Sequence, residues 1–170
     1  MTSFSAPVSA PEMEEAVIAL PFGRMALRCS AEQVVHLDYL APDARLVPPA
    51  TPLGRELAAQ LLAYCGNPGH RFDLPLASAG TMFQNRVWAL LQRIPPGQTL
   101  TYGEAADRLG SAARAVGQAC GANPFAPIVP CHRIVARGGL GGFAHSTQSD
   151  GHLLHIKRWL LLHEGAGSDG

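Results

Sequence analysis

The chain has 170 residues, enough to bury a core as one domain or as a small domain joined to a larger one. Lysine plus arginine and aspartate plus glutamate number 13 each, so net charge does not indicate nucleic acid or an anionic membrane as a partner, and any basic surface must be local. The four cysteines lie far apart without a C-x-x-C pair, which argues against a zinc knuckle, a thioredoxin-like redox pair or a small disulfide scaffold.

The N-terminal sequence has no cationic segment followed by an apolar block, and no apolar run in the chain is long enough to span a bilayer. We therefore expect a cytoplasmic protein that does not contact a membrane. Its high content of Ala, Gly and Pro with few Lys is typical of a GC-rich bacterial source. Residues 1–15, which begin with a Ser-, Ala- and Pro-rich stretch, and the small polar residues 166–170 are expected to be disordered.

Residues 16–78 are expected to form an N-terminal α/β domain of mainly structural role. Short β-favouring runs between Ala16 and Tyr39 are separated by turn-forming residues, which predicts a small antiparallel meander. After a Pro-rich loop, Thr51 is a suitable cap for a helix that Pro52 opens and Gly66 closes. Nothing in this region looks catalytic.

Residues 79–165 are expected to form a second, mostly helical domain. A threonine followed three residues later by Gln or Glu opens its first two helices, at Thr81 and Thr101, and Ser111 is expected to cap the third. The second and third helices are joined by Leu-Gly-Ser, which is the outline of a helix-turn-helix. Helical hairpins of this kind are common, and the outline alone does not establish DNA binding.

The third helix is almost without bulky side chains. Ala113, Ala115 and Gly117 are small, and Arg114 is the one long side chain near its start. Such a helix can approach a DNA groove closely, with the arginine reaching phosphate or entering a base stack. It can equally pack against a neighbouring helix while Arg114 remains solvated. The pattern leaves both interpretations open.

Cys131 stands in the sequence PIVPCHRIV. The flanking apolar residues are typical of a buried strand with an inert core thiol. Pro130, however, cannot donate to a sheet ladder, so the strand is interrupted or lies at an edge there. His132 and Arg133 place a base and a cation beside the sulfur, and such neighbours lower the pKa of a thiol and favour the nucleophilic thiolate.

Several ordered motifs carry a family resemblance. The sequence ANP precedes PCHR, RAVG and a helix containing a tyrosine lie upstream, and a glycine-rich loop and KRWLLLHEG follow. Over residues 82–165 the chain resembles the O6-alkylguanine-DNA alkyltransferase family. The resemblance implies an α/β (α+β) protein, with a ribonuclease H-like sheet and helix followed by a helical domain that contains a winged-helix-like helix-turn-helix.

The resemblance implies a DNA-repair function without a cofactor. Cys131 would irreversibly accept the methyl or alkyl group of O6-alkylguanine, and of O4-alkylthymine, in double-stranded DNA. His132 would deprotonate the thiol through a water, Glu164 would orient His132, and Asn123 would brace the turn that carries the cysteine. A thiolate in a desolvated pocket is a suitable nucleophile for an alkyl carbon. Without the resemblance, Asn123 is an ordinary turn residue and Glu164 a solvated carboxylate.

The resemblance also implies minor-groove binding by the third helix, with the damaged nucleotide flipped out of the duplex. Arg114 would take the place of the flipped nucleotide, and Tyr102 would push on the target phosphate. The remaining residues expected to contact DNA are Ala113, Ala115, Gly117 and Arg133, with Arg93 and Arg108 adding to the basic surface. The family implies a monomer that needs no obligate protein partner.

The glycine-rich loop departs from the family pattern. Phe143 and Ala144 stand where a tyrosine and a polar residue are common, so backbone N–H groups, Ser146 or the Tyr102 hydroxyl would have to steady the leaving group. We expect tolerance of alkyl groups larger than methyl, which a failure to transfer benzyl would contradict. Lys157 matches the basic residue of the last helix, or lies on a solvated face. No metal is expected, because a clustered Cys-Cys-His set is missing from the sequence.

Three other functions are compatible with parts of the sequence. A non-catalytic binder of alkylated DNA would keep the third helix but lack the acceptor, and Cys131 argues against it. A Cys-His hydrolase would need an oxyanion hole, for which the sequence offers no distinct sign. A helix-turn-helix regulator is disfavoured because its third helix offers almost no side chains to read base edges. The sequence does not decide whether Cys120 is reactive.

Overall fold

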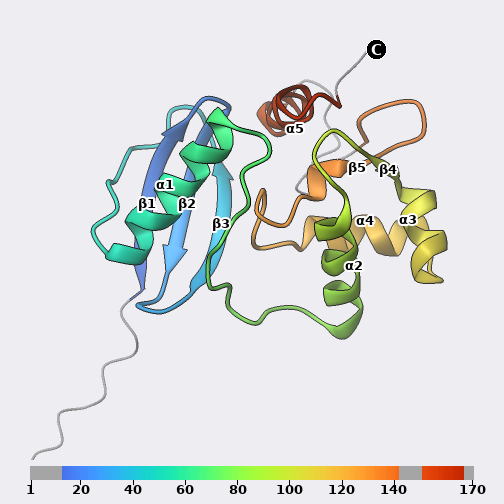
Figure 1. Ribbon diagram of the computed structural model, residues 1–170, viewed down its shortest axis with the longest axis horizontal. Helices are drawn as coiled ribbons and strands as arrows, with labels where there is room; N and C mark the ends of the chain where they lie inside the picture. The colour runs from blue at the N-terminus through green and yellow to red at the C-terminus, as the bar shows by residue number, and fades with distance from the viewer. Residues whose placement is uncertain (1–12, 142–150, 167–170) are drawn as a thin grey trace, which may run out of the picture.

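The computed structural model describes residues 13–141 and 151–166, which form a sheet-containing N-terminal half and a helical C-terminal half (Figure 1). The N-terminal half is an antiparallel sheet in the order β1-β2-β3, with α1 lying across one face. Its elements are β1 (Glu14–Leu20), β2 (Gly23–Cys29), β3 (Val34–Leu40) and α1 (Pro52–Gly66). The predicted meander is confirmed, but its first strand begins two residues before Ala16, within the segment 1–15 that was expected to be disordered.

Helix α1 begins and ends where the sequence predicts. The Thr51 hydroxyl accepts a hydrogen bond from Gly54 N at 3.0 Å, and Gly66 is the last helical residue. The Glu14 carboxylate accepts hydrogen bonds from Ala50 N and Thr51 N, which ties the helix start to β1. The buried face of α1 packs on the sheet and consists of Gly54, Leu57, Ala58, Leu61 and Tyr64.

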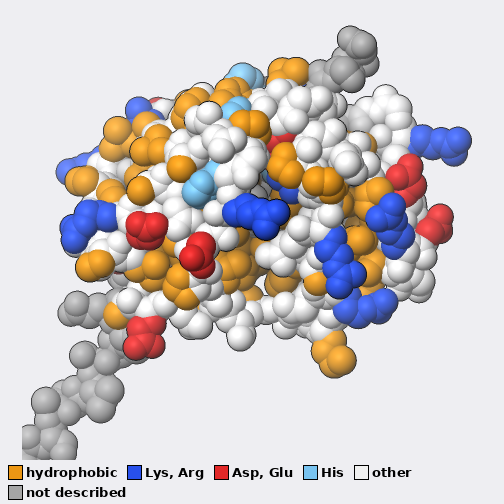
Figure 2. Space-filling model, viewed as in Figure 1, with side chains coloured by type: hydrophobic (Ala, Val, Ile, Leu, Met, Phe, Trp, Pro, Cys, Tyr) orange, Lys and Arg blue, Asp and Glu red, His pale blue; other side chains and the backbone are white. Residues whose placement is uncertain are grey.

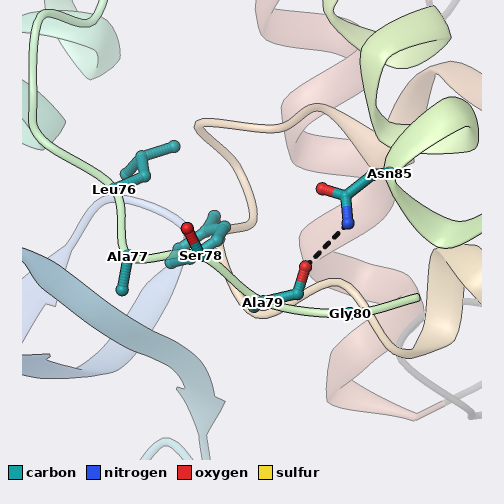
Figure 3. Close-up of a pocket in the computed structure, with 7 residues that line it drawn as sticks. Leu76, Ala77, Ser78, Ala79, Gly80 and Asn85 are labelled. Carbon is teal, nitrogen blue, oxygen red and sulfur yellow. Dashed lines mark hydrogen bonds between the residues drawn. The ribbon is translucent and has the colours of Figure 1, made fainter. Parts of the chain in front are cut away.

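The linker between α1 and α2 runs along β3. Val34 N donates to Pro75 O at 2.7 Å, and Ala77 N donates to Val34 O at 2.8 Å. Further on, Asn85 donates a side-chain hydrogen bond to Ala79 O, beside a hollow of about 570 Å³ (Figure 3). The described residues that line this hollow include no charged side chain, thiol or histidine, so the Ser78 hydroxyl has no base beside it there.

The C-terminal half has two capped helices where they were expected. Thr81 and Gln84 form a reciprocal capping box, and Thr101 Oγ1 accepts from Glu104 N at 3.1 Å. The prediction that Ser111 caps the third helix is wrong. Ser111 N bonds to Ala106 O and so completes the end of the preceding helix, and Ala112 precedes the third helix without a side-chain cap. The elements are α2 (Met82–Arg93), β4 (Leu100–Thr101), α3 (Tyr102–Leu109), α4 (Ala113–Gly121), the 3-10 turn η1 (Cys131–Arg133), β5 (Ile134–Val135) and α5 (His152–His163).

Parallel pairing of β4 with β5 places β5, which directly follows η1, beside the start of α3. Cys131 therefore lies on a tight turn immediately before a short strand, and the interpretation that it is part of a buried strand is wrong. The two halves meet near this turn, because Leu37 N of β3 donates to Pro124 O at 2.8 Å. Helix α5 lies above the junction of the two halves (Figure 1). Among the described residues, no helix is long and apolar enough to cross a bilayer.

Candidate active site

Cys131 is 6% exposed and lines a hollow of about 390 Å³ between β3, the end of α4 and the start of α5. Other residues that line it include Tyr39, Cys120 and Asn123. Burial raises the pKa of the Cys131 thiol, while a hydrogen bond from Asn123 and the nearby charge of Lys157 oppose that rise. Cys131 is therefore a thiol at neutral pH, and a nucleophilic role requires a base to remove its proton.

Asn123 holds the loop that leads to Cys131. Its Nδ2 donates to Val129 O at 2.8 Å, and its Oδ1 accepts from Phe125 N at 2.9 Å. Cys131 N in turn bonds to Val129 O at 2.9 Å. The amide thus spans the loop between α4 and η1 and also reaches the sulfur, which is more than an isolated Asn-Pro turn would do.

His132 is fully buried, and its Nε2 lies 2.9 Å from Oε2 of Glu164. Burial lowers the pKa of His132, and the Glu164 carboxylate partly opposes that shift, so the imidazole is neutral near pH 7. Its Nδ1 has no hydrogen bond to another described residue, and the contact of Nε2 with Glu164 is short but not aligned as a regular hydrogen bond. A neutral imidazole held at one nitrogen by a carboxylate has its other nitrogen available as a base.

Glu164 caps the C-terminus of α5 and is only 8% exposed. Arg133 donates to it through Nε at 2.9 Å and Nη2 at 2.8 Å, and Tyr64 Oη donates at 2.6 Å. Burial raises the pKa of this carboxyl, but the hydrogen bonds from His132, Arg133 and Tyr64 outweigh burial and hold it well below its usual range. The alternative of a solvated carboxylate is therefore wrong.

The same contacts correct the expectation for Arg133. Its side chain is 11% exposed, and its guanidinium is occupied by Glu164 and by Ile94 O. A guanidinium bound in this way is not available to a DNA phosphate, so Arg133 is a partner of the buried carboxylate and not a DNA contact.

Lys157 is fully buried, which excludes the alternative of a solvated face. Its Nζ donates to Ile134 O at 2.7 Å and lies 5.9 Å from the centre of the Tyr102 ring. Burial lowers the pKa of Lys157 to about 8, with the nearby cysteines opposing the shift. The ammonium lies on the Cys131 side of α5, where its positive charge favours the thiolate.

Tyr102 begins α3 and lies between two glycines. Carbon atoms of its ring are 3.7 Å from the place of a Cβ on Gly117 and 2.9 Å from that on Gly141. Gly141 also has φ of +73°, so both its backbone conformation and the tyrosine ring require glycine there. Burial raises the pKa of Tyr102 to about 12, so its hydroxyl keeps its proton near neutrality.

Helix α4 presents small residues and one cation to solvent. Ala113 and Arg114 are exposed, while Ala115 and Gly117 are half-buried. On the opposite side, Ala119 O accepts a hydrogen bond from Trp88 Nε1 at 2.9 Å, which anchors α4 to α2. Lys and Arg side chains gather on the face of the helical half near α2 and α3 (Figure 2). The exposed arginines of α2, α3 and α4 are Arg86, Arg93, Arg108 and Arg114.

Phe143, Ala144 and Ser146 lie outside the described residues. Within the described ranges, no three His, Cys, Asp or Glu side chains are grouped in a way that could hold a metal ion. The residues that the structure does bring together are Cys131, His132, Asn123, Lys157 and Glu164, with Tyr102 close to Lys157.

Two tyrosines of the N-terminal half reach this region and were missed from the sequence. Tyr64 of α1 contacts Glu164, and Tyr39 of β3 lines the same hollow as Cys131. The spacing of Leu57, Leu61 and Tyr64 marks one buried face of a helix, and a buried tyrosine usually finds a hydrogen-bond partner. That signal predicts a partner but cannot identify one on a distant segment.

Comparisons with known proteins cover both halves of the chain. The family model of the 6-O-methylguanine DNA methyltransferase DNA-binding domain matches residues 82–166. The methylated-DNA–protein-cysteine methyltransferase of Methanosarcina acetivorans is 38% identical over 162 residues, which cover 91% of this chain and 99% of that protein. A crystal structure of Mycobacterium tuberculosis O6-methylguanine methyltransferase matches with a TM-score of 0.72 at 34% identity, over 94% of this chain and 96% of that chain. A crystal structure of M. tuberculosis OGT in complex with DNA matches with a TM-score of 0.72 at 36% identity, over 90% and 93% of the two chains.

Proposed function

The chain belongs to the methylated-DNA–protein-cysteine methyltransferase family, and from this premise we propose that it repairs DNA by irreversibly moving a methyl or larger alkyl group from O6 of guanine to its own Cys131. O4-alkylthymine is a second substrate. The observation that carries the proposal is a group of three buried side chains. The Cys131 thiol is next in the chain to His132, and the neutral imidazole of His132 is paired with the Glu164 carboxylate. The chain acts once, as a single-turnover methylated-DNA–protein-cysteine S-methyltransferase.

The chemistry is an in-line displacement at the alkyl carbon. His132 takes the Cys131 proton through a water, and the sulfur then forms a bond to the alkyl carbon while the bond from that carbon to guanine O6 breaks. The electron pair of the broken bond stays on the guanine, which takes up a proton and leaves as the normal base. Lys157 favours the thiolate, the Tyr102 hydroxyl is a proton donor for the leaving base, and Asn123 keeps the sulfur in place. The stable thioether makes the step irreversible.

Binding to double-stranded DNA takes place through α4 in the minor groove. The small residues Ala113, Ala115 and Gly117 permit close approach, and the exposed Arg114 fills the space that the flipped nucleotide leaves in the stack. Tyr102 presses on the target phosphate. Helices α3 and α4 with the short strands β4 and β5 act as a winged-helix-like unit. Exposed arginines on the helical half support a local, sequence-independent contact with phosphates.

The N-terminal half is proposed to be a ribonuclease H-like module. A monomer is sufficient for repair, because one chain carries both the DNA-binding helix and the acceptor thiol. A cytoplasmic place of action follows from chromosomal DNA as substrate in a bacterial cell. The alkyl pocket is proposed to admit groups larger than methyl. Equal transfer of methyl and benzyl would support this pocket, and a failure to transfer benzyl would contradict it.

A non-catalytic binder of alkylated DNA is the competing function. The discriminating experiment follows the DNA: duplex oligonucleotides with one O6-methylguanine are incubated with increasing amounts of protein, then digested and analysed for methylated and normal base. We expect loss of one O6-methylguanine per molecule of protein, with normal guanine restored. Full retention of O6-methylguanine in DNA that the protein nevertheless binds would contradict the proposed transfer and favour the non-catalytic function.

A further inference from the structure

Tyr64 connects the N-terminal half to the buried carboxylate of the active site. It lies on α1, is 2% exposed, and donates from its hydroxyl to Oε2 of Glu164 at 2.6 Å. This is the same oxygen that lies 2.9 Å from His132 Nε2. The side chain of a residue in the N-terminal half is thus a direct neighbour of the pair that is proposed to activate Cys131.

A second contact fixes Tyr64 to the same end of α5. The backbone carbonyl of Tyr64 is 2.7 Å from Nε2 of His163, and the two rings meet edge to face at 5.2 Å. His163 also stacks on Trp159 with ring centres 4.7 Å apart. Tyr64 therefore holds two consecutive residues at the C-terminus of α5, one through its backbone and the other through its hydroxyl.

Oε2 of Glu164 accepts hydrogen bonds from Tyr64 Oη and Arg133 Nη2 and lies 2.9 Å from His132 Nε2, whereas Oε1 accepts a hydrogen bond from Arg133 Nε. Each of these groups draws electron density from Oε2. The interaction of this oxygen with the other two groups is weakened as a result. A carboxylate at the C-terminus of a helix also faces the negative end of the helix dipole, so it depends on donors to stay in place. The hydroxyl of Tyr64 supplies one without adding a charge.

We propose that Tyr64 is a positioning residue for alkyl transfer, which fixes the Glu164 carboxylate against His132 and limits its basicity, so that the N-terminal half takes part in activating the acceptor. This inference rests on the proposed function and extends it to a residue outside the DNA-binding domain. Tyr64 acts through Glu164 and does not touch substrate.

Removal of the Tyr64 hydroxyl should shift the pH dependence of the transfer rate in one direction. The titratable and charged groups that surround His132 and Glu164 are Arg133 of η1, Lys157 of α5, Tyr64 of α1 and Tyr39 of β3. If the hydroxyl is removed, Oε2 becomes a stronger acceptor and stabilises the imidazolium. The pKa of His132 then rises, a larger share of the imidazole is protonated at a given pH, and the acid limb of the rate profile moves to higher pH.

The experiment compares Tyr64→Phe with a matched control at the same contact, His163→Phe. The control keeps an aromatic ring against Trp159 and loses only the hydrogen bond to the Tyr64 carbonyl. For each protein, the second-order rate of transfer from O6-methylguanine duplex is measured from pH 5.5 to 9, and reactive molecules are counted by complete alkylation. Affinity for the lesion duplex and the midpoint of urea unfolding are measured alongside.

We expect Tyr64→Phe to transfer roughly tenfold more slowly near neutral pH, with its acid limb at higher pH and its DNA affinity unchanged. His163→Phe should keep the parental rate and profile per reactive molecule. If Tyr64→Phe has the parental rate and profile, or if both variants slow equally without a shift of the limb, Tyr64 is only structural and the inference is overturned. If the parental protein itself transfers nothing, the proposed function fails. This outcome differs from failure of the Tyr64 inference, because it is seen in the parental protein without either variant.

Discussion

His132 and Glu164 form a buried pair, with the imidazole Nε2 2.9 Å from the carboxylate Oε2. The pair joins the turn that carries Cys131 to the end of the last helix, two segments that lie far apart in the chain. Because the pair is shielded from water, the protonation state of each member is set by the other and by Arg133, Lys157 and Tyr64. The stability of the fold and the reactivity of the thiol therefore depend on the same few contacts.

Replacement of Glu164 by glutamine should reduce both stability and activity. The variant keeps the shape of the side chain but leaves the buried Arg133 guanidinium without its counter-charge, and breaking a buried pair in this way typically costs about 3–5 kcal/mol. Urea unfolding measures this loss, and the transfer rate per reactive molecule should fall as well. Glu32→Gln, on an exposed turn, is the matched control. A Glu164→Gln protein as stable and as fast as the control would show that the pair has neither role.

Acidification should destabilise the fold in two successive ranges. The pKa of His132 is lowered in the folded protein, so below about 6.5 the unfolded chain binds a proton that the folded protein refuses, and stability falls. The pKa of Glu164 is lowered too, so its contribution is complete above about 4.5 and is lost as the pH falls further toward its folded value. Urea midpoints between pH 8 and 3.5 test this, and an unchanged midpoint over that interval would contradict both assignments.

Cys120 should not act as a second acceptor, although it lines the same hollow as Cys131. Burial and the neighbouring Cys131 raise the pKa of Cys120 to about 12, so almost none of it is thiolate at neutral pH. We expect Cys120→Ala to accept one alkyl group per molecule, like the parental protein. The measurement is the number of alkyl groups bound after exhaustive treatment with alkylated duplex, and a number that falls in the variant would identify Cys120 as an acceptor.

Arg114 should matter for duplex DNA more than for single strands. It is exposed on α4, and its proposed role is to fill the gap left in a base stack, which a single strand lacks. Arg114→Ala is expected to slow transfer from a duplex by about tenfold or more and from a single-stranded oligonucleotide by clearly less. Arg55→Ala on α1 removes a charge of the N-terminal half as the control. An equal loss of transfer rate on both substrates would show that Arg114 acts only as a phosphate contact.

Local signals in the sequence were sufficient for most secondary structure. The threonine caps at Thr51, Thr81 and Thr101 act through side chains within three residues, so the sequence identifies them directly. Ser111 was misassigned because a serine after glycine fits two places, the end of one helix or the start of the next. In the structure, Ser111 belongs to the end of α3, where Gly110 adopts the left-handed conformation at φ of +63°.

Local signals in the sequence could not predict the contacts between residues that are far apart in the chain. The sequence placed Cys131 beside His132, but Arg133 looked like a phosphate contact because its partner Glu164 lies on another element. Lys157 had the same ambiguity, since a lysine on a helix is usually solvated and this one is buried against Ile134. Tyr64 was missed entirely, because only the packing of α1 against the end of α5 brings its hydroxyl to the carboxylate.

Intact mass is the measurement that tests the central proposal most directly. The protein is weighed before and after incubation with a duplex that contains O6-methylguanine, beside Cys131→Ala as control, and the modified peptide is then mapped. We expect the parental protein to gain one methylene mass at Cys131, saturating at one per molecule, and the variant to gain none. An unchanged parental mass with binding to the lesion retained, or a methyl group that maps to another residue, would contradict the assignment of Cys131 as the alkyl acceptor.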